Sequence, residues 1–330
     1  MPIGVVAIAA TARYVAESRR ARAARPDWAG AAVFTAALAA LVYGLIRAGQ
    51  ESWSDGVVIA CLAGAAVLLG VFVAIERTVA DPMFDLSLLR IPTFLGRSVA
   101  ALTMNGSLFA MFLYVVLYLQ NGLGYSAWET GLRLLLVSGT TLVAATVAGR
   151  LSTAGSARWL VGPGLLLVGA GMMLLTGLDA GSGWTHFIAG FLVAGFGAGL
   201  VNPPLASTAV GVVTPDRSGM ASGINNTWRQ VGIAVGTAVY GTMFTAGLRS
   251  SLAGSESFGG ADGDRIADAL QHGGAETIIS GAPEAARPAM AHDLAAAFAS
   301  SMNGLLLTGG LVAVAGGVLS LLLIRPRDFV

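Results

Sequence analysis

The sequence predicts an all-helical, polytopic integral membrane protein. Hydrophobic residues make up 55% of its 330 residues and charged residues only 11%, whereas soluble domains carry about 25% charged residues. Mean hydropathy is +0.74. The apolar residues stand in long continuous runs without the alternation of a membrane β-barrel. Helices are then the structure that satisfies every backbone hydrogen bond inside lipid.

Eight apolar runs are each long enough to cross a bilayer, since one crossing needs about 20 residues. They are residues 29–48, 57–75, 98–119, 131–149, 159–178, 186–210, 219–247 and 301–324. A cluster of arginines, Arg13 to Arg25, precedes the first run, and basic loops favour the cytoplasmic side. Alternating the loops from there predicts eight spans in the cell membrane with both ends of the chain in the cytoplasm.

The other segments complete this domain plan. Residues 1–16 are interpreted as the end of a span whose first part is missing, so we expect either that the chain is truncated or that its true start lies upstream. The rest of the plan is a basic cytoplasmic loop at 17–28, two spans at 29–76, a cytoplasmic linker at 77–97, a six-span unit at 98–324 with an extracytoplasmic loop at 248–300, and a cytoplasmic tail at 325–330.

The span at 219–247 carries the densest polar pattern. Asn225, Asn226, Arg229 and Gln230 form one polar turn about a third of the way along it. Such groups are costly at membrane depth unless they face protein or a water-filled cavity. For the three amides, contact between helices and the lining of a substrate pathway are both open interpretations. The intramembrane charge of Arg229 favours a functional role.

Other spans supply further candidates for the lining of a pathway. Asn105 lies deep in its span, and Asn202 precedes two prolines that interrupt a helix. Packing is the alternative role for Asn202. Met104, Met111 and Phe112 would supply an adaptable apolar wall.

Glycines at four-residue spacing predict close contacts between helices. They are Gly195 and Gly199 in one span and Gly219, Gly223, Gly232 and Gly236 in another. The Gly-x-Gly pattern around Gly195 does not indicate a dinucleotide loop, because no strand precedes it.

Two pairs of charged residues are candidates for gating. Asp216 and Arg217 form a charged turn that leads into the span at 219–247. Glu129 and Arg133 stand four residues apart at the start of a helix, a spacing that favours a salt bridge. Alternatively, this second pair caps and orients its helix.

The sequence shows no arrangement typical of catalysis or of metal binding. It has no nucleophile beside a base and no histidines at metal-ligand spacing, and its single cysteine, Cys61, lies inside a span. No carboxylate lies deep in any of the eight spans. We therefore expect no enzyme, no cofactor, no metal and no nucleic acid partner. The expected partners are membrane lipid and a small molecule.

Four stretches resemble the drug:proton antiporters with fourteen spans, a branch of the major facilitator superfamily. The most specific is PDRSGMASGINNTWRQVG at 215–232, which resembles a late span of that family. Residues 81–90 resemble the linker before its ninth span, residues 124–132 the loop between its ninth and tenth spans, and residues 2–4 with 17–19 the end of its sixth span. Residues 152–153 depart from the family, whose members often carry a charge there.

This resemblance implies the C-terminal portion of an exporter of small amphipathic compounds, a multidrug or antibiotic-resistance pump driven by protons. The missing N-terminal six-helix half would hold the family's membrane-embedded acidic residue. Two alternatives stand beside it. One is a truncated or degenerate membrane protein that does not transport, and the other is a half-transporter that acts as a homodimer or heterodimer.

Overall fold

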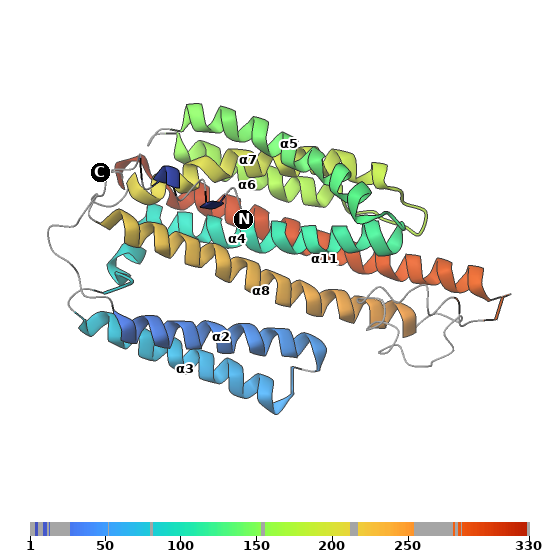
Figure 1. The fold of residues 1–330 in the computed structure, drawn as a ribbon, viewed down its shortest axis with the longest axis horizontal. Coiled ribbons are helices and arrows are strands. Elements are labelled where there is room, and N and C mark those ends of the chain that lie inside the picture. Colours follow the sequence, from blue (N-terminus) through green and yellow to red (C-terminus); the bar gives the residue numbers. More distant parts are fainter. Residues whose placement is uncertain are drawn as a thin grey trace.

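The computed structural model is a bundle of long helices (Figure 1). It describes residues 4–5, 9–11, 13, 27–51, 53–79, 82–152, 156–211, 217–253, 280, 283–284 and 286–328. Within these residues there is no strand, and eight helices are long and apolar enough to cross a membrane. The predicted fold class is therefore confirmed.

The helices follow the predicted spans in order. They are α2 (Trp28–Gln50), α3 (Gly56–Thr78), α4 (Pro92–Leu117), α5 (Ala127–Leu151), α6 (Ala157–Leu174), α7 (Phe187–Gly211), α8 (Ser218–Ala253) and α11 (Arg287–Leu323). Short helical turns lie between or after them: η1 (Leu86–Arg90), η2 (Tyr118–Gly122), η3 (Trp184–His186) and η6 (Pro326–Asp328).

Several helices extend beyond the predicted spans. α4 begins at Pro92, a residue suited to a first helical turn because it lacks an N–H that would go unbonded. α8 continues to Ala253 and α11 begins at Arg287, so both ends of the predicted loop 248–300 are helical. In the part of α11 before the predicted span, Leu294, Ala297 and Phe298 are buried, and the ring of Phe298 lies 4.9 Å from that of Phe244 on α8. Hydropathy missed these turns because packing against protein stabilises them rather than lipid.

The helices form a six-helix unit with two further helices on its flank. α5, α6 and α7 lie together on one side, α4 and α11 lie beside them, and α8 follows (Figure 1). α2 and α3, called here the accessory pair, pack on each other and contact the unit through α2 and α8. An apolar cleft of about 310 Å³, lined by residues such as Phe34, Phe72 and Trp228, separates the pair from α8.

Small residues allow the helices of the unit to touch backbone to backbone. A Cβ placed on Gly236 would collide with the carbonyl oxygen of Gly106 on α4, and a Cβ on Gly106 would lie 3.0 Å from the carbonyl oxygen of Gly232. On the other side of the unit, a Cβ on Gly195 of α7 would lie 2.7 Å from the carbonyl oxygen of Val137 on α5. Gly199 contacts α5 in the same way. Inside a bilayer the hydrophobic effect does not drive helices together, because lipid is as apolar as the side chains. Close packing of this kind holds the helices together instead.

Candidate functional site

A pocket of about 510 Å³ opens between α4, α5, α7 and α8. We call it the inner pocket. It is lined by Met104, Asn105, Leu108, Phe109, Phe112, Val137, Ser138, Thr141, Leu142, Ala145, Ala198, Asn202 and Arg229. Phe109 is 50% exposed and Leu142 is 70% exposed, so one side of the pocket is open to whatever surrounds this chain.

Five of the residues proposed for a pathway meet in the inner pocket. Met104, Asn105 and Phe112 come from α4, Asn202 from α7 and Arg229 from α8. The two amides are held by their own helices. Asn105 Nδ2 donates to the carbonyl oxygen of Ala101 at 2.8 Å, and Asn202 Nδ2 donates to that of Ala198 at 3.1 Å. Their orientation is therefore fixed before any ligand arrives.

Arg229 is the charged residue among those lining the inner pocket. Within the described part of the chain, its guanidinium has no hydrogen-bond or ion-pair partner. A guanidinium presents five N–H donors in a planar fork. The pocket can therefore offer a cation and several donors to a ligand against a mainly apolar wall.

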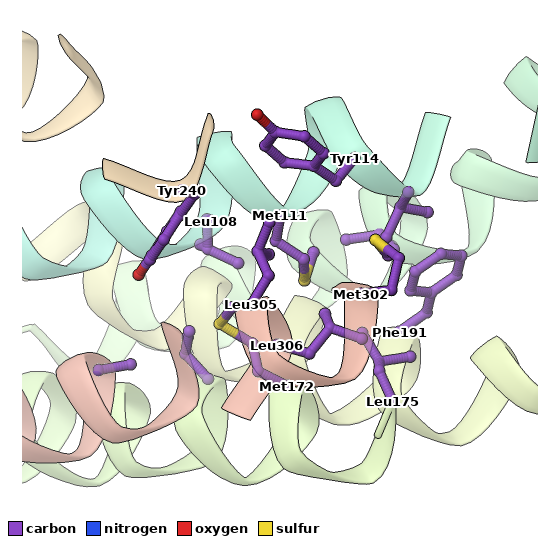
Figure 2. Close-up of a cluster of buried hydrophobic side chains, with 14 of the residues drawn as sticks. Leu108, Met111, Tyr114, Met172, Leu175, Phe191, Tyr240, Met302, Leu305 and Leu306 are labelled. Atoms are coloured by element: carbon purple, nitrogen blue, oxygen red, sulfur yellow. The ribbon is translucent and has the colours of Figure 1, made fainter. Parts of the chain in front are cut away.

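Met111 does not line the pocket. Its side chain lies in the hydrophobic core with Met172, Leu305 and Leu306, and none of its surface is exposed (Figure 2). Met111, which the sequence placed in the pathway wall, therefore contributes to the core of the unit and not to the lining of the inner pocket.

The three amide residues of the polar turn in α8 lie in two different environments. Asn225 is buried and its Oδ1 has no hydrogen-bond partner among the described atoms. Asn226 and Gln230 are exposed on a different face of the helix. None of the three lines the inner pocket.

Gly219 and Gly223 lie on this same exposed face. A Cβ on either would meet no described atom within 4 Å, so neither glycine packs closely against a described helix of this chain. With Ser222, Asn226 and Gln230 they form an exposed stripe of small and amide residues at helical spacing, called here the α8 stripe.

Glu129 and Arg133, the gating candidates at the start of α5, form a helix cap and an aromatic contact in the structure. Glu129 forms a capping box with Ser126 at the start of α5, with its Oε2 accepting from the Ser126 backbone N at 2.9 Å. Arg133 stacks over the ring of Tyr125, 3.6 Å from its centroid. Among the described residues no salt bridge joins Glu129 to Arg133, so the capping alternative is the one observed.

Arg217 ties the start of α8 to the linker. Its Nη1 donates to Asp85 Oδ2 at 2.7 Å. Burial alone would raise the pKa of Asp85, but hydrogen bonds from Ser87 and the charge of Arg217 outweigh it, so the pKa is lowered. Asp216 lies outside the described residues.

Several pocket-lining or buried residues were not predicted from the sequence. Ser138 and Thr141 of α5 line the inner pocket, yet single hydroxyls in an apolar span carry no distinguishing signal.

Arg97 was assigned to a cytoplasmic linker, but it lies in α4, 1% exposed, with Nε and Nη1 unpaired among the described residues. Glu76 was assigned to a span end and is buried. Hydropathy plots place charges at boundaries and cannot show which boundaries are covered by protein.

Comparison with known proteins supports a transporter family. The family model described as Major Facilitator Superfamily matches residues 2–237. The chain is 32% identical over 252 residues to Multidrug resistance protein Stp of Mycobacterium tuberculosis, which covers 76% of this chain and 47% of that protein. It is 31% identical to Methylenomycin A resistance protein of Streptomyces coelicolor, with 74% of this chain and 51% of that protein covered.

The name of a third relative refers to export. The chain is 29% identical to Tetracenomycin C resistance and export protein of Streptomyces glaucescens, with 74% of this chain and 46% of that protein covered. The chain therefore spans about half the length of these relatives. The matched family and relatives are transporters and not enzymes. With a family model covering most of its length, and with membrane-crossing helices in the predicted order, this chain belongs to the Major Facilitator Superfamily.

Proposed function

We propose that this chain is the C-terminal portion of a proton-coupled exporter of small amphipathic compounds. It would lie in the cell membrane with both ends in the cytoplasm, and an N-terminal six-helix half would complete it. The names of its relatives, which refer to multidrug resistance, antibiotic resistance and export, support this class of activity.

The observation that carries the proposal is the inner pocket. It combines a broad apolar wall with fixed amides and one unpaired cation, and it is open along Phe109 and Leu142. In transporters built from two repeats, the substrate lies near the bilayer midplane where the repeats face each other. An open pocket of this composition suits one side of such a site.

The α8 stripe supports the second half of the proposal. Asn226 and Gln230 are exposed, and amides facing lipid are unfavourable because nothing there satisfies them. Gly219 and Gly223 beside them leave room for a second backbone to approach. A helix of the N-terminal half packed along this stripe would satisfy both features.

Each pocket residue then has a defined task. Arg229 would bind acceptor groups of the substrate, Asn105 and Asn202 would orient it, and the apolar wall including Met104 and Phe112 would accept varied hydrophobic shapes. Arg217, held by Asp85, would fix the linker while the halves move.

The test is proton-dependent efflux of a fluorescent amphipathic dye from cells that lack their own drug pumps. The chain is expressed alone and beside a version with six further spans upstream. We expect efflux from the extended version, abolished by an uncoupler, and none from the short one at equal membrane abundance. An extended version that is abundant but exports nothing would overturn the exporter proposal. Efflux from the short chain would overturn the requirement for a second half and indicate assembly of copies.

A further inference from the structure

The apolar cleft between the accessory pair and α8, called here the accessory cleft, has a volume of about 310 Å³. The pair lies beside α8 and touches it through α2 (Figure 1). Phe34 of α2, Val73 of α3 and Trp228 of α8 line the cleft, and Leu89 of η1 lines its end nearest the linker. Apart from the hydroxyl of Thr227, the described side chains of the lining are aliphatic or aromatic.

Water is an unsuitable occupant of the accessory cleft. A buried water molecule needs two to four polar partners, and the described side chains of the lining offer the one hydroxyl of Thr227. An empty cleft would lose dispersion contacts along its lining. The side chains of Phe34, Leu69 and Val231 are only half-buried, so they have surface left for an occupant to cover. The lining therefore calls for an apolar occupant.

The accessory cleft lies at membrane depth. Its walls are α2, α3 and α8, all of them long and apolar enough to cross a bilayer. Trp228 follows the start of α8 at Ser218 by ten residues, or about 15 Å along the helix axis. The material that surrounds a protein at such a depth is the hydrocarbon of lipid chains. An acyl chain is therefore the apolar occupant available to this cleft.

Two arginines stand at the linker end of the accessory cleft. Arg90 directly follows Leu89, and Arg77 stands four residues after Val73, a spacing that places both side chains on one face of α3. Because α3 ends at Thr78, Arg77 lies where the chain leaves the apolar layer. Both arginines are exposed, and neither guanidinium has a hydrogen-bond or ion-pair partner within the described part of the chain. Positive charge at one end and an apolar lining beyond it are the complement of an anionic lipid.

The linker end of the cleft is held in place by the protein itself. Phe84 lines the cleft, and its backbone N donates to Glu76 Oε2 at 3.1 Å. The next residue, Asp85, accepts from Arg217 Nη1 at 2.7 Å. These bonds attach the linker to α3 and to α8, so the cleft is largely formed before a ligand arrives, as is usual for binding sites. Asp85 is already paired and leaves the two arginines available to another anion.

We propose that the accessory cleft binds one anionic phospholipid, with an acyl chain between α2, α3 and α8 and the phosphate beside Arg77 and Arg90. The planar fork of a guanidinium matches the oxygens of a phosphate, and basic clusters at the membrane surface attract anionic lipids. The lipid fills the space that separates the accessory pair from the six-helix unit and so joins the two. This site goes beyond the proposed export activity and does not depend on it.

The experiment is quenching of tryptophan fluorescence by lipids that carry bromine in the middle of their acyl chains. The purified full chain is placed in phosphatidylcholine vesicles that contain increasing fractions of brominated phosphatidylglycerol or of brominated phosphatidylcholine. The difference between the wild-type chain and Trp228→Phe isolates the signal of Trp228, which lines the cleft. We expect half of this signal to be quenched at an about fivefold or more lower fraction of the anionic lipid, since basic residues near the surface favour it.

Two pairs of variants separate the charged end of the cleft from its apolar part. Arg77→Gln combined with Arg90→Gln should remove the preference for the anionic lipid, whereas Arg150→Gln, at an exposed position near the end of α5, should keep it. Val231→Phe places a larger side chain in the cleft and should reduce quenching by both lipids. Its control is Val143→Phe on α5, at a position that is 62% exposed, which should leave quenching unchanged.

A second measurement uses the wild-type protein in detergent and so does not depend on the variants folding. A ligand that binds the folded state raises the melting temperature as its concentration rises. Phosphatidylglycerol should raise it more than phosphatidylcholine with the same chains, and soluble glycerol phosphate should leave it unchanged. An equal rise with glycerol phosphate would indicate a site for the anion alone and would overturn the proposal.

Three outcomes of the quenching experiment would also contradict the lipid site. Equal quenching of wild-type Trp228 by the two brominated lipids would show that the cleft does not select an anionic headgroup. An unchanged preference in the double arginine variant would remove Arg77 and Arg90 from the site. Protection of Trp228 from both lipids would mean that another part of the protein fills the cleft.

Discussion

At the scale of single residues, helical geometry separates side chains that are adjacent in sequence. Successive residues of an α-helix point about 100° apart, so Arg229 and Gln230 face different surroundings. Arg229 reaches the inner pocket, whereas Gln230 joins Asn226 on the exposed stripe. One polar turn thus serves two surfaces, and the two sets of residues should respond differently to substitution.

Replacing Arg229 with Ala tests the pocket assignment in the extended, transporting protein. A hydrogen bond to a charged group contributes about 1.5–3 kcal/mol, and about 1.4 kcal/mol corresponds to a tenfold effect. We expect dye efflux to fall about tenfold or more at unchanged membrane abundance, with Arg229→Lys in between. Arg150→Ala, at an exposed position near the end of α5, is the control and should leave efflux unchanged. Normal efflux from Arg229→Ala would remove Arg229 from the substrate site.

At the scale of elements, the glycines of α8 serve two faces. Gly232 and Gly236 contact α4 at Leu102 and Gly106, while Gly219 and Gly223 face outwards. The sequence spacing is the same for both pairs. The inward pair brings α8 against α4 within the six-helix unit. For the outward pair, contact with the proposed N-terminal half is the role to be tested.

Leucine substitutions distinguish these faces. Gly232→Leu forces a side chain into the backbone of α4, and overpacking costs about 1–3 kcal/mol or more. We expect lower abundance and a lower melting temperature of this chain expressed alone. Gly223→Leu, on the same helix, should leave both unchanged in the chain alone but should reduce assembly and efflux in the extended protein. Equal effects of the two substitutions on the chain alone would contradict the assignment.

At the scale of the whole molecule, the accessory pair and the six-helix unit are joined by a polar contact as well as by apolar packing. Arg217 at the start of α8 bonds Asp85 in the linker, and the linker is bonded to α3 through Glu76. The pKa of Asp85 is lowered in the folded protein. Ionised Asp85 therefore contributes its full stabilisation of the folded state above the ordinary carboxyl pKa of about 3.9. It is lost only as pH falls through the lowered value.

Asp85→Asn should therefore lower the melting temperature by the same amount at about pH 6 and about pH 8, and the difference from the wild-type protein should shrink at about pH 3. Arg217→Gln should reproduce the loss. The double variant should add little, since both changes remove one interaction. A difference between wild type and Asp85→Asn that changes between about pH 6 and pH 8 would contradict this assignment.

Much of the candidate site could be anticipated from residue type and position. Asn105, Asn202 and Arg229 are polar residues inside apolar spans, and the cost of placing them in lipid is enough to predict a protein or cavity environment. Met111 and the outward glycines could not be assigned in this way. An apolar or small residue is compatible with core, pocket and lipid alike, and only the packing of neighbouring helices distinguishes these environments.

The sequence by itself determined the helical class and the order and approximate limits of the spans, because only a helix satisfies the backbone hydrogen bonds of a long apolar run inside a bilayer. Its motifs, above all residues 215–232, indicated the family. The tertiary structure decided which face of each helix is covered. It placed Arg97 and Glu76 in buried surroundings and gathered four helices around the inner pocket. Burial and unpaired atoms depend on what lies opposite a side chain, and a linear sequence does not contain that neighbour.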